Sequence, residues 1–179
     1  MAYKTIFEEI QENTGGVRQS RAWYREQLAQ VTSRNLIVDE QSDEVGDELI
    51  RDSNRVTSLP RLFNLHFYEY KAKTRRNLPY YDKFPLAFVL DVNYDSFFAV
   101  NLHYYYPEER MSIAASLAEN RIPRFAKGAH KYLLSEVRSP YLNLAEQEWQ
   151  TICLLPVEQF VRDLGGVEIP ISSEKVWSK

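Results

Sequence analysis

The stretch that decides the fold runs from residue 62 to residue 106 and reads LFNLHFYEY (62–70), KAKTRRN (71–77), LPYYDKFPLAFVLDVNYD (78–95) and SFFAVNLHYYY (96–106). Most of the aromatic residues of the chain lie here, in three β-rich runs separated by residues typical of turns. In the first run, Phe63, Leu65, Phe67 and Glu69 alternate with more polar neighbours, and we expect this set to face inward. The stretch therefore predicts a compact β core.

The second and third runs are expected to pair as a hairpin. Residues 86–91 are typical of a buried strand, residues 93–96 of a turn, and residues 97–106 of the returning strand. Three or more strands joined by short turns indicate an antiparallel sheet, and a small SH3-like barrel is one form that such a sheet takes.

Two prolines bracket the segment between the first two runs. Pro79 and Pro85 flank residues 80–84, and residues 71–77 form a basic turn before them. Because proline cannot donate a hydrogen bond to a strand ladder, the bracketed segment is expected to be a loop or a strand edge.

The remaining chain carries helical signals. Apolar spacing and helix-end residues predict helices at residues 3–12, 18–31, 107–117, 127–139, 143–153 and 156–164, followed by an extended tail from 167 to 179. Asn143 with Glu146 resembles a capping box, and Gly165-Gly166 is expected to end the last helix. Residues 39–58 are acidic and poor in apolar side chains, so we expect an arm that becomes ordered against a partner.

These signals predict an α+β fold with three parts. Residues 1–60 are expected to hold the N-terminal helices and the acidic arm, residues 61–106 the antiparallel β module, and residues 107–179 a helical part with an extended tail.

Composition excludes several classes of protein. The formal net charge of the 179 residues is −3, so no global basic field indicates nucleic acid. The one cysteine, Cys153, lies in an apolar run and is expected to be buried. No apolar run reaches the ~18 residues that span a bilayer, and the N-terminus lacks the apolar region of a signal peptide. We therefore expect a soluble protein that is intracellular or assembled inside a cell.

Catalytic and metal-binding motifs are missing from the sequence. His66, His103 and His130 lie far apart and have no neighbours at ligand spacing. No nucleophile elbow, Walker loop or zinc-protease motif occurs. We therefore expect a protein that is not an enzyme and that holds neither a metal nor another cofactor.

Two groups of basic residues are candidates for phosphate contacts. The candidates are Lys71, Lys73, Arg75 and Arg76 in the basic turn, and Arg121, Arg124, Lys127, Lys131 and Arg138 further on. DNA binding requires several of them on one surface, with aromatic rings such as Tyr104 to Tyr106 as stacking platforms. In the alternative interpretation, the tyrosines are core and interface residues and the basic side chains pair with acidic neighbours on another subunit.

The motif LPYYDKFP (78–85), followed after a hairpin by FFAVNLHY (97–104), resembles a family of structural proteins from T4-like and related contractile-tailed bacteriophages. Further similarity lies at KYL (131–133), EW (148–149) and LPVEQF (155–160), so the resemblance covers about residues 62–162. It is looser at Ser20 to Tyr24. The chain departs from the family pattern at Tyr105-Tyr106-Pro107, where the family has Leu-Pro-Pro.

The resemblance implies a component of the virion that assembles in the host cytoplasm. It implies a non-enzymatic structural protein of the baseplate and tail hub or of the head–tail region, with tail, baseplate or neck subunits as partners. Because some family members are labelled DNA end protectors, the alternative is a protein that binds DNA ends. Expected partner contacts are Tyr80, Tyr81, Asp82, Phe84, Tyr104, Tyr105, Trp23 and Tyr24. Two of the residues between the prolines, Tyr80 and Tyr81, offer large contact areas with few rotatable bonds.

Overall fold

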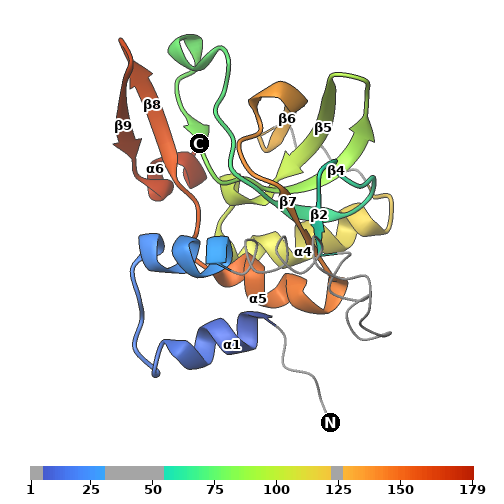
Figure 1. Ribbon diagram of the computed structural model, residues 1–179, viewed down its shortest axis with the longest axis vertical. Coiled ribbons are helices and arrows are strands. Elements are labelled where there is room, and N and C mark those ends of the chain that lie inside the picture. Colours follow the sequence, from blue (N-terminus) through green and yellow to red (C-terminus); the bar gives the residue numbers. More distant parts are fainter. Residues whose placement is uncertain (1–5, 31–54, 122–126) are drawn as a thin grey trace, which may run out of the picture.

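A computed structural model describes residues 6–30, 55–121 and 127–179. Its centre is an antiparallel six-stranded sheet in the order β1-β7-β2-β4-β5-β6, beside a three-stranded antiparallel sheet in the order β3-β8-β9 (Figure 1). The strands are β1 (Val56–Thr57), β2 (Leu65–Phe67), β3 (Tyr81–Asp82), β4 (Leu86–Val92), β5 (Ser96–Asn101), β6 (Ala129–Leu133), β7 (Tyr141–Leu144), β8 (Phe160–Leu164) and β9 (Val167–Ile171). The α+β class with antiparallel sheets is confirmed.

Helices cover one side of the large sheet. They are α1 (Ile6–Asn13), a helical segment over residues 21–30, α4 (Pro107–Ala118), α5 (Trp149–Leu154) and α6 (Ser173–Trp177). Short 3₁₀ turns are η1 (Arg75–Asn77), η2 (Leu102–Tyr104), η3 (Leu134–Glu136) and η4 (Glu146–Glu148). The helices expected near the N-terminus and at residues 107–117 are confirmed in their described parts. Pro107 occupies the first turn of α4, where its missing N–H is no loss.

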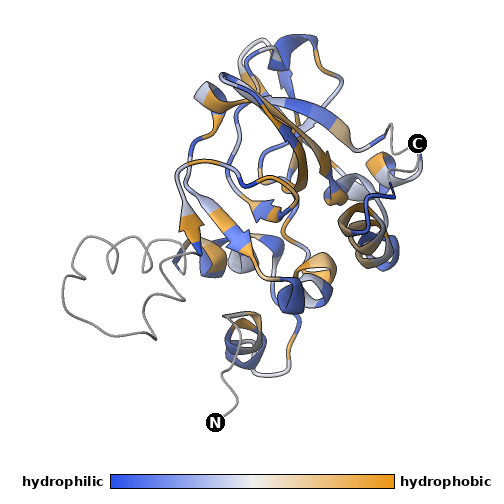
Figure 2. Cartoon of the chain, turned by 90° about the vertical axis from the view of Figure 1, so that its right-hand side faces the viewer, coloured by the Kyte–Doolittle hydropathy of each residue, from blue (hydrophilic) through white to orange (hydrophobic). Residues whose placement is uncertain are grey.

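Both faces of the large sheet are buried, which corrects the expectation of one inward face. Leu65 and Phe67 of β2 face the helices, as expected, in a core that also holds residues of α4 and α5. Tyr68 lies in a second, tyrosine-rich core on the opposite face. Phe63 does not face inward: it is 56% exposed and has a positive φ of 56°. In Figure 2, apolar residues are concentrated in the central strands and on the helices packed against them.

The sheet is open and does not close into a barrel. The expected hairpin is confirmed, with Val92 of β4 opposite Phe97 of β5. The returning strand ends at Asn101, earlier than expected, because η2 turns the chain there. Within the described residues, β1 and β6 are the two edges of the sheet and do not pair with each other. The SH3-like barrel is therefore not the form adopted.

Two helices expected in the C-terminal part are strands. Residues 127–139 contain β6, which pairs with the edge of β5, and η3. Residues 156–164 contain β8, which turns back into β9 through Gly165 and Gly166. These glycines have φ values of 65° and 94°, and two consecutive positive φ angles suit a tight hairpin turn. The glycine pair thus forms a hairpin turn and not the end of a helix.

The capping box lies two residues later than expected. The backbone N–H of Ala145 donates to Oε2 of Glu148 at 3.1 Å, which starts η4 and α5 after β7 has ended. Asn143 belongs to β7 instead. The tail expected to be extended forms β9 and then α6, which is capped by the Ser172 side chain.

The N-terminal helices belong to the main core. Phe7 and Ile10 of α1, together with Tyr24 and Leu28, pack in the same cluster as β2, β4 and α4. Most of the expected acidic arm, residues 39–54, lies outside the described residues. Its end is described, and Val56 and Thr57 pair with β7 as β1.

Candidate nucleic-acid interface

A pocket lies between the basic turn after β2 and the strand β6. Its volume is about 320 Å³. We call it the tyrosine pocket, and it is lined by Tyr70, Ala72, Lys73, Thr74, Leu78, Tyr80, Tyr81, Asp82, Tyr104, His130, Lys131, Tyr132 and Leu133. It therefore draws residues from the basic turn, the proline-bracketed segment, η2 and β6.

The proline-bracketed segment supplies one wall. Tyr81 and Asp82 form β3, the edge of the small sheet, where Tyr81 lies opposite Val161 of β8. A strand edge was one of the two expected forms of this segment. Tyr80, just before β3, is half-buried, and its ring packs edge-on against Phe160 with the ring centroids 6.0 Å apart.

The turn η2 supplies Tyr104. The side chain of Asn101 caps η2 by accepting a hydrogen bond from the backbone N–H of His103 at 3.1 Å. The same amide oxygen accepts from the Leu86 N–H, and the amide nitrogen donates to Asp82. Asn101 thus joins β4, β3 and η2, and it fixes the position of Tyr104 beside His130, whose ring centroid lies 4.6 Å away.

Asp82 anchors the wall from inside. One carboxylate oxygen accepts hydrogen bonds from the backbone N–H groups of Phe84 and Gln159. The other accepts from Asn101 Nδ2 and from His103 Nδ1, at 2.7 Å. Burial alone raises the pKa of Asp82, but His103 and these hydrogen bonds outweigh it, so the pKa lies below its usual value. Asp82 is therefore ionised.

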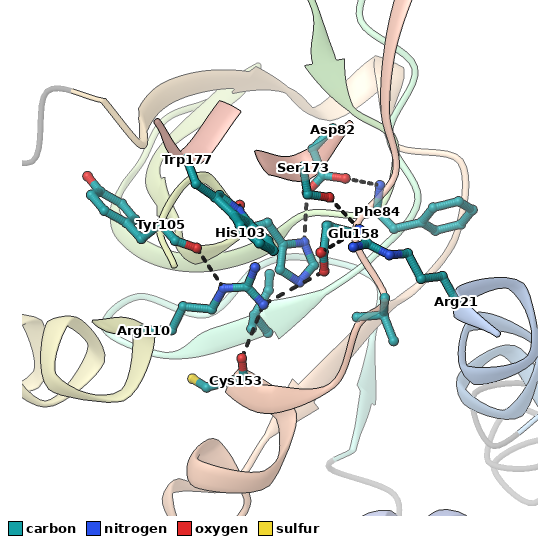
Figure 3. Close-up of polar contacts among 12 residues, drawn as sticks. Arg21, Asp82, Phe84, His103, Tyr105, Arg110, Cys153, Glu158, Ser173 and Trp177 are labelled. Carbon is teal, nitrogen blue, oxygen red and sulfur yellow. Dashed lines mark hydrogen bonds and ion pairs between the residues drawn. The ribbon is translucent and has the colours of Figure 1, made fainter. Parts of the chain in front are cut away.

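A buried polar network continues on the far side of His103 (Figure 3). Arg110 is fully buried; its side chain donates to the backbone carbonyls of Tyr105 and Cys153, and it lies 3.7 Å from Glu158. Arg21 donates to Glu158 at 2.7 Å and to Ser173. This network attaches residues 21–30 and α6 to the strands that carry the pocket.

The structure brings together part of the two basic groups. Lys73 of the first and Lys131 of the second both line the tyrosine pocket, and both are exposed. In the part of the chain that is described, neither makes a side-chain hydrogen bond or an ion pair. Lys71 and Arg76 are exposed on the same turn as Lys73.

Other basic candidates are engaged elsewhere. Arg75 pairs with Asp163 at 2.8 Å, and Arg121 pairs with Glu119 on the surface. Lys127 donates to the Trp177 carbonyl at 2.6 Å. Arg138 pairs with Glu136. Arg124 lies outside the described residues.

The residues expected to contact partners are mostly internal. Tyr24, Tyr81, Asp82, Tyr104 and Tyr105 are buried, whereas Trp23, Tyr80 and Phe84 are half-buried. Their role as partner contacts stays a prediction.

Sequence reasoning missed several residues of the site. His130 and Tyr132 lie within residues 127–139, for which the apolar spacing predicts a helix, and the run AHKYL (129–133) has no regular alternation that would indicate a strand. The internal partners Arg110 and Glu158 gave no sequence signal, because nothing in the pattern shows that a charged side chain is buried.

Two further findings concern metal binding and membrane insertion by the described residues. They contain no cluster of three or more His, Cys, Asp or Glu that could hold a metal ion. They also contain no helix with the length and apolarity needed to cross a membrane.

The fold and the site together define a small α+β protein with an aromatic pocket between exposed lysines, a candidate nucleic-acid-binding protein. The family model described as phage T4 terminal DNA protecting protein matches residues 17–128. Because the match spans more than half of the chain, the protein belongs to this phage family. No curated protein and no solved structure matches the chain.

Proposed function

We propose that this protein binds the ends of phage DNA and shields them by occupying them. The observation that carries the proposal is the convergence of Lys73 and Lys131, from two separate basic segments, on one pocket lined by tyrosines. Basic residues that bind DNA must lie together on one surface. Basic groups on two separate surfaces would have argued against DNA binding. The family to which the chain belongs supports the same function.

The charges of the protein suit short-range contacts between lysines and DNA phosphates. The net charge of −3 gives no long-range attraction to DNA, so affinity depends on lysines placed close to phosphates. Lys73 and Lys131 are exposed and have no ion-pair partner within 4.0 Å among the described residues, so binding a phosphate breaks no close salt bridge. Lys131 does attract a neighbouring carboxylate: a hydrogen bond from Ser96 and the charge of Lys131 both lower the pKa of Asp95. The acid nearest to the pocket, Asp82, is already satisfied by four hydrogen bonds.

We further propose that the protein acts without catalysis. Asp82 and His103 resemble the Asp–His part of a hydrolytic triad, but the His103 side chain is fully buried and packed inside the fold. A group that cannot reach solvent cannot take a proton from a substrate. The pair therefore acts as a positioning contact for the pocket walls.

A second part of the proposal is assembly within the virion, with other virion proteins. The β8–β9 hairpin exposes Leu164, Val167 and Ile169, at 47%, 65% and 41%. Within the described residues, β9 is also an unpaired edge of the small sheet. Exposed apolar side chains on a free strand edge suit contact with another protein chain. A tail, baseplate or neck subunit is the partner that the resemblance to the phage structural proteins implies.

Nuclease protection tests the proposed function. A linear duplex is incubated with the protein and then with a processive exonuclease, and the surviving full-length DNA is measured. We expect protection by the wild type and loss of protection with Lys73→Gln/Lys131→Gln. The matched control Arg18→Gln/Lys175→Gln removes two exposed charges that do not line the pocket, and it should protect normally. Equal protection by both double variants, or none by the wild type, would contradict the proposal.

A further inference from the structure

The tyrosine pocket is a hollow as well as a basic surface. Its volume of about 320 Å³ lies at the lower end of the ~300–1,000 Å³ typical of small-ligand sites. A double helix cannot enter a space of this size, whereas one nucleotide can. The rings that line it belong to Tyr70, Tyr80, Tyr81, Tyr104 and Tyr132. Aromatic faces of this kind stack on nucleobases without regard to their sequence.

Polar groups divide the pocket into an outer and an inner part. Lys73 and Lys131 are the exposed lysines of its lining. Asp82 lies in its wall and is buried. A phosphate is attracted by the exposed lysines and repelled by the Asp82 carboxylate, so the phosphate is expected at the outer part of the pocket. The inner part suits an uncharged group.

His130 lines the pocket as a neutral ring, because burial lowers its pKa. Its Nε2 atom has no hydrogen-bond partner within the described residues, but it is closed off from solvent, so a base in the pocket does not reach it in this arrangement of side chains. The ring therefore adds an uncharged wall to the inner part of the pocket.

Lys179 places a further cation beside one of the pocket tyrosines. Nζ of Lys179 lies 5.1 Å from the ring centroid of Tyr80, over its face. Tyr80 is half-buried, so part of its ring stays accessible. Tyr80 therefore combines a half-buried ring with a positive charge beside it.

We propose that the tyrosine pocket takes the unpaired terminal nucleotide of a DNA end, with the base inside against the tyrosines and its phosphate at Lys73 and Lys131. This inference rests on the proposed function and goes further, because it makes a single-stranded overhang the recognised feature. A base that is already unpaired enters without the cost of breaking a pair, so overhangs should bind better than blunt ends.

Fluorescent DNA ends test the inference. Three ligands of the same duplex sequence are compared: one closed at both ends by hairpin loops, one with a blunt end, and one with a single unpaired 2-aminopurine at the end. We expect wild-type protein to bind the overhang roughly ten-fold more tightly than the blunt end, through one stacked base. The 2-aminopurine fluorescence should fall as the base stacks on a tyrosine.

Two pocket variants make the test specific. Tyr80→Leu keeps apolar packing and removes a ring, and Thr74→Glu places a negative charge on an exposed pocket residue. Both should bring the overhang-to-blunt affinity ratio close to one. Tyr94→Leu, at a fully exposed tyrosine, and Gln150→Glu, at an exposed helix residue, are the matched controls and should keep the ratio. Thermal unfolding of each variant confirms that it is folded.

The outcomes separate the two proposals. Tighter binding of both open-ended ligands than of the closed one, without preference for the overhang, overturns the pocket assignment alone. Retention of the ratio by folded Tyr80→Leu and Thr74→Glu also overturns it. Equal binding of all three ligands overturns the proposed function as well.

Discussion

The carboxylate of Asp82 accepts a hydrogen bond from Nδ1 of His103 at 2.7 Å, and both side chains are buried. The two residues come from the two halves of the sequence motif, LPYYDKFP and NLHY. Their contact ties β3 to η2, which contain Tyr81 and Tyr104 of the tyrosine pocket, and Tyr80 directly precedes β3. The two halves of the motif are therefore joined by a buried hydrogen bond, and this bond fixes the segments that line the proposed binding site.

Replacing Asp82 should destabilise the whole protein. Asp82→Asn removes a charged acceptor of four hydrogen bonds, and we expect the free energy of unfolding to fall by about 3 kcal/mol. Because the pKa of Asp82 is lowered by folding, this stabilisation exists above its unfolded pKa of ~3.9 and is lost as pH falls through the folded value. Urea unfolding at pH 7 and at pH 3 measures both effects.

The exposed Asp91 provides the control for Asp82. Asp91→Asn should change the free energy of unfolding by less than about 0.5 kcal/mol. If Asp82→Asn were as mild as Asp91→Asn at pH 7, the anchoring role of Asp82 would be wrong.

His66 should make the protein sensitive to mild acid. Its ring is buried, and its Nε2 accepts a hydrogen bond from the Arg61 N–H at 3.1 Å. Burial lowers its pKa to about 4. Between pH 6.5 and 4 the unfolded chain therefore binds a proton that the folded protein does not, so stability falls as pH falls. We expect a loss of about 2 kcal/mol from His66 between pH 7 and pH 5.

The variant His66→Gln isolates this contribution. His130 also has a lowered pKa and acts in the same direction, so some pH dependence remains in the variant. Urea unfolding at the two pH values should show a smaller difference for His66→Gln than for the wild type. An unchanged difference would show that His66 does not titrate as its burial requires.

Arg110 should be the most sensitive basic residue in terms of stability. It is fully buried and lies 3.7 Å from the buried carboxylate of Glu158. Arg110→Met removes a buried positive charge that offsets the Glu158 carboxylate. We therefore expect the free energy of unfolding to fall by about 3 kcal/mol. The exposed pair of Arg121 and Glu119 gives the comparison, because Arg121→Met should cost less than about 1 kcal/mol.

Thermal unfolding of the two arginine variants provides the measurement. The double variant Arg110→Met/Glu158→Gln should recover part of the loss, since it removes both charges. Equal unfolding temperatures for Arg110→Met and Arg121→Met would contradict the role assigned to the buried network.

The sequence predicted those elements whose signals are local. The hairpin of β4 and β5 and the helix α4 follow from turn residues, an apolar strand and Pro107 at a helix start. Each signal needs only neighbouring residues, so the structure confirms these elements with small changes at their ends.

The strands β6 and β8 could not be recognised in this way. Residues 129–133 become a strand because the edge of β5 is available to pair with them, which is a contact distant in sequence. For β8, a glycine pair such as Gly165-Gly166 suits both the end of a helix and a hairpin turn, and the apolar spacing of residues 156–164 favoured the helix.

The sequence predicted individual residues of the candidate site but not that they form one pocket. The sequence named Lys73, Lys131, Tyr80 and Tyr104 as candidates, but it left DNA contact and protein contact as alternatives. Their union in one pocket depends on the pairing of β6 with β5 and on the Asn101 cap of η2. Neither contact can be read from a single sequence.

The most direct test of the account is the affinity of the protein for open and closed DNA across a range of salt concentrations. Fluorescence anisotropy should show tighter binding to an open-ended duplex than to the same duplex closed by hairpin loops. Lys73→Gln/Lys131→Gln should weaken binding to the open end and lower the slope of log affinity against log salt by about 2, one per lysine. The variant Arg18→Gln/Lys175→Gln should behave like the wild type. Equal affinity for open and closed DNA, or an unchanged slope in the pocket variant, would contradict the account.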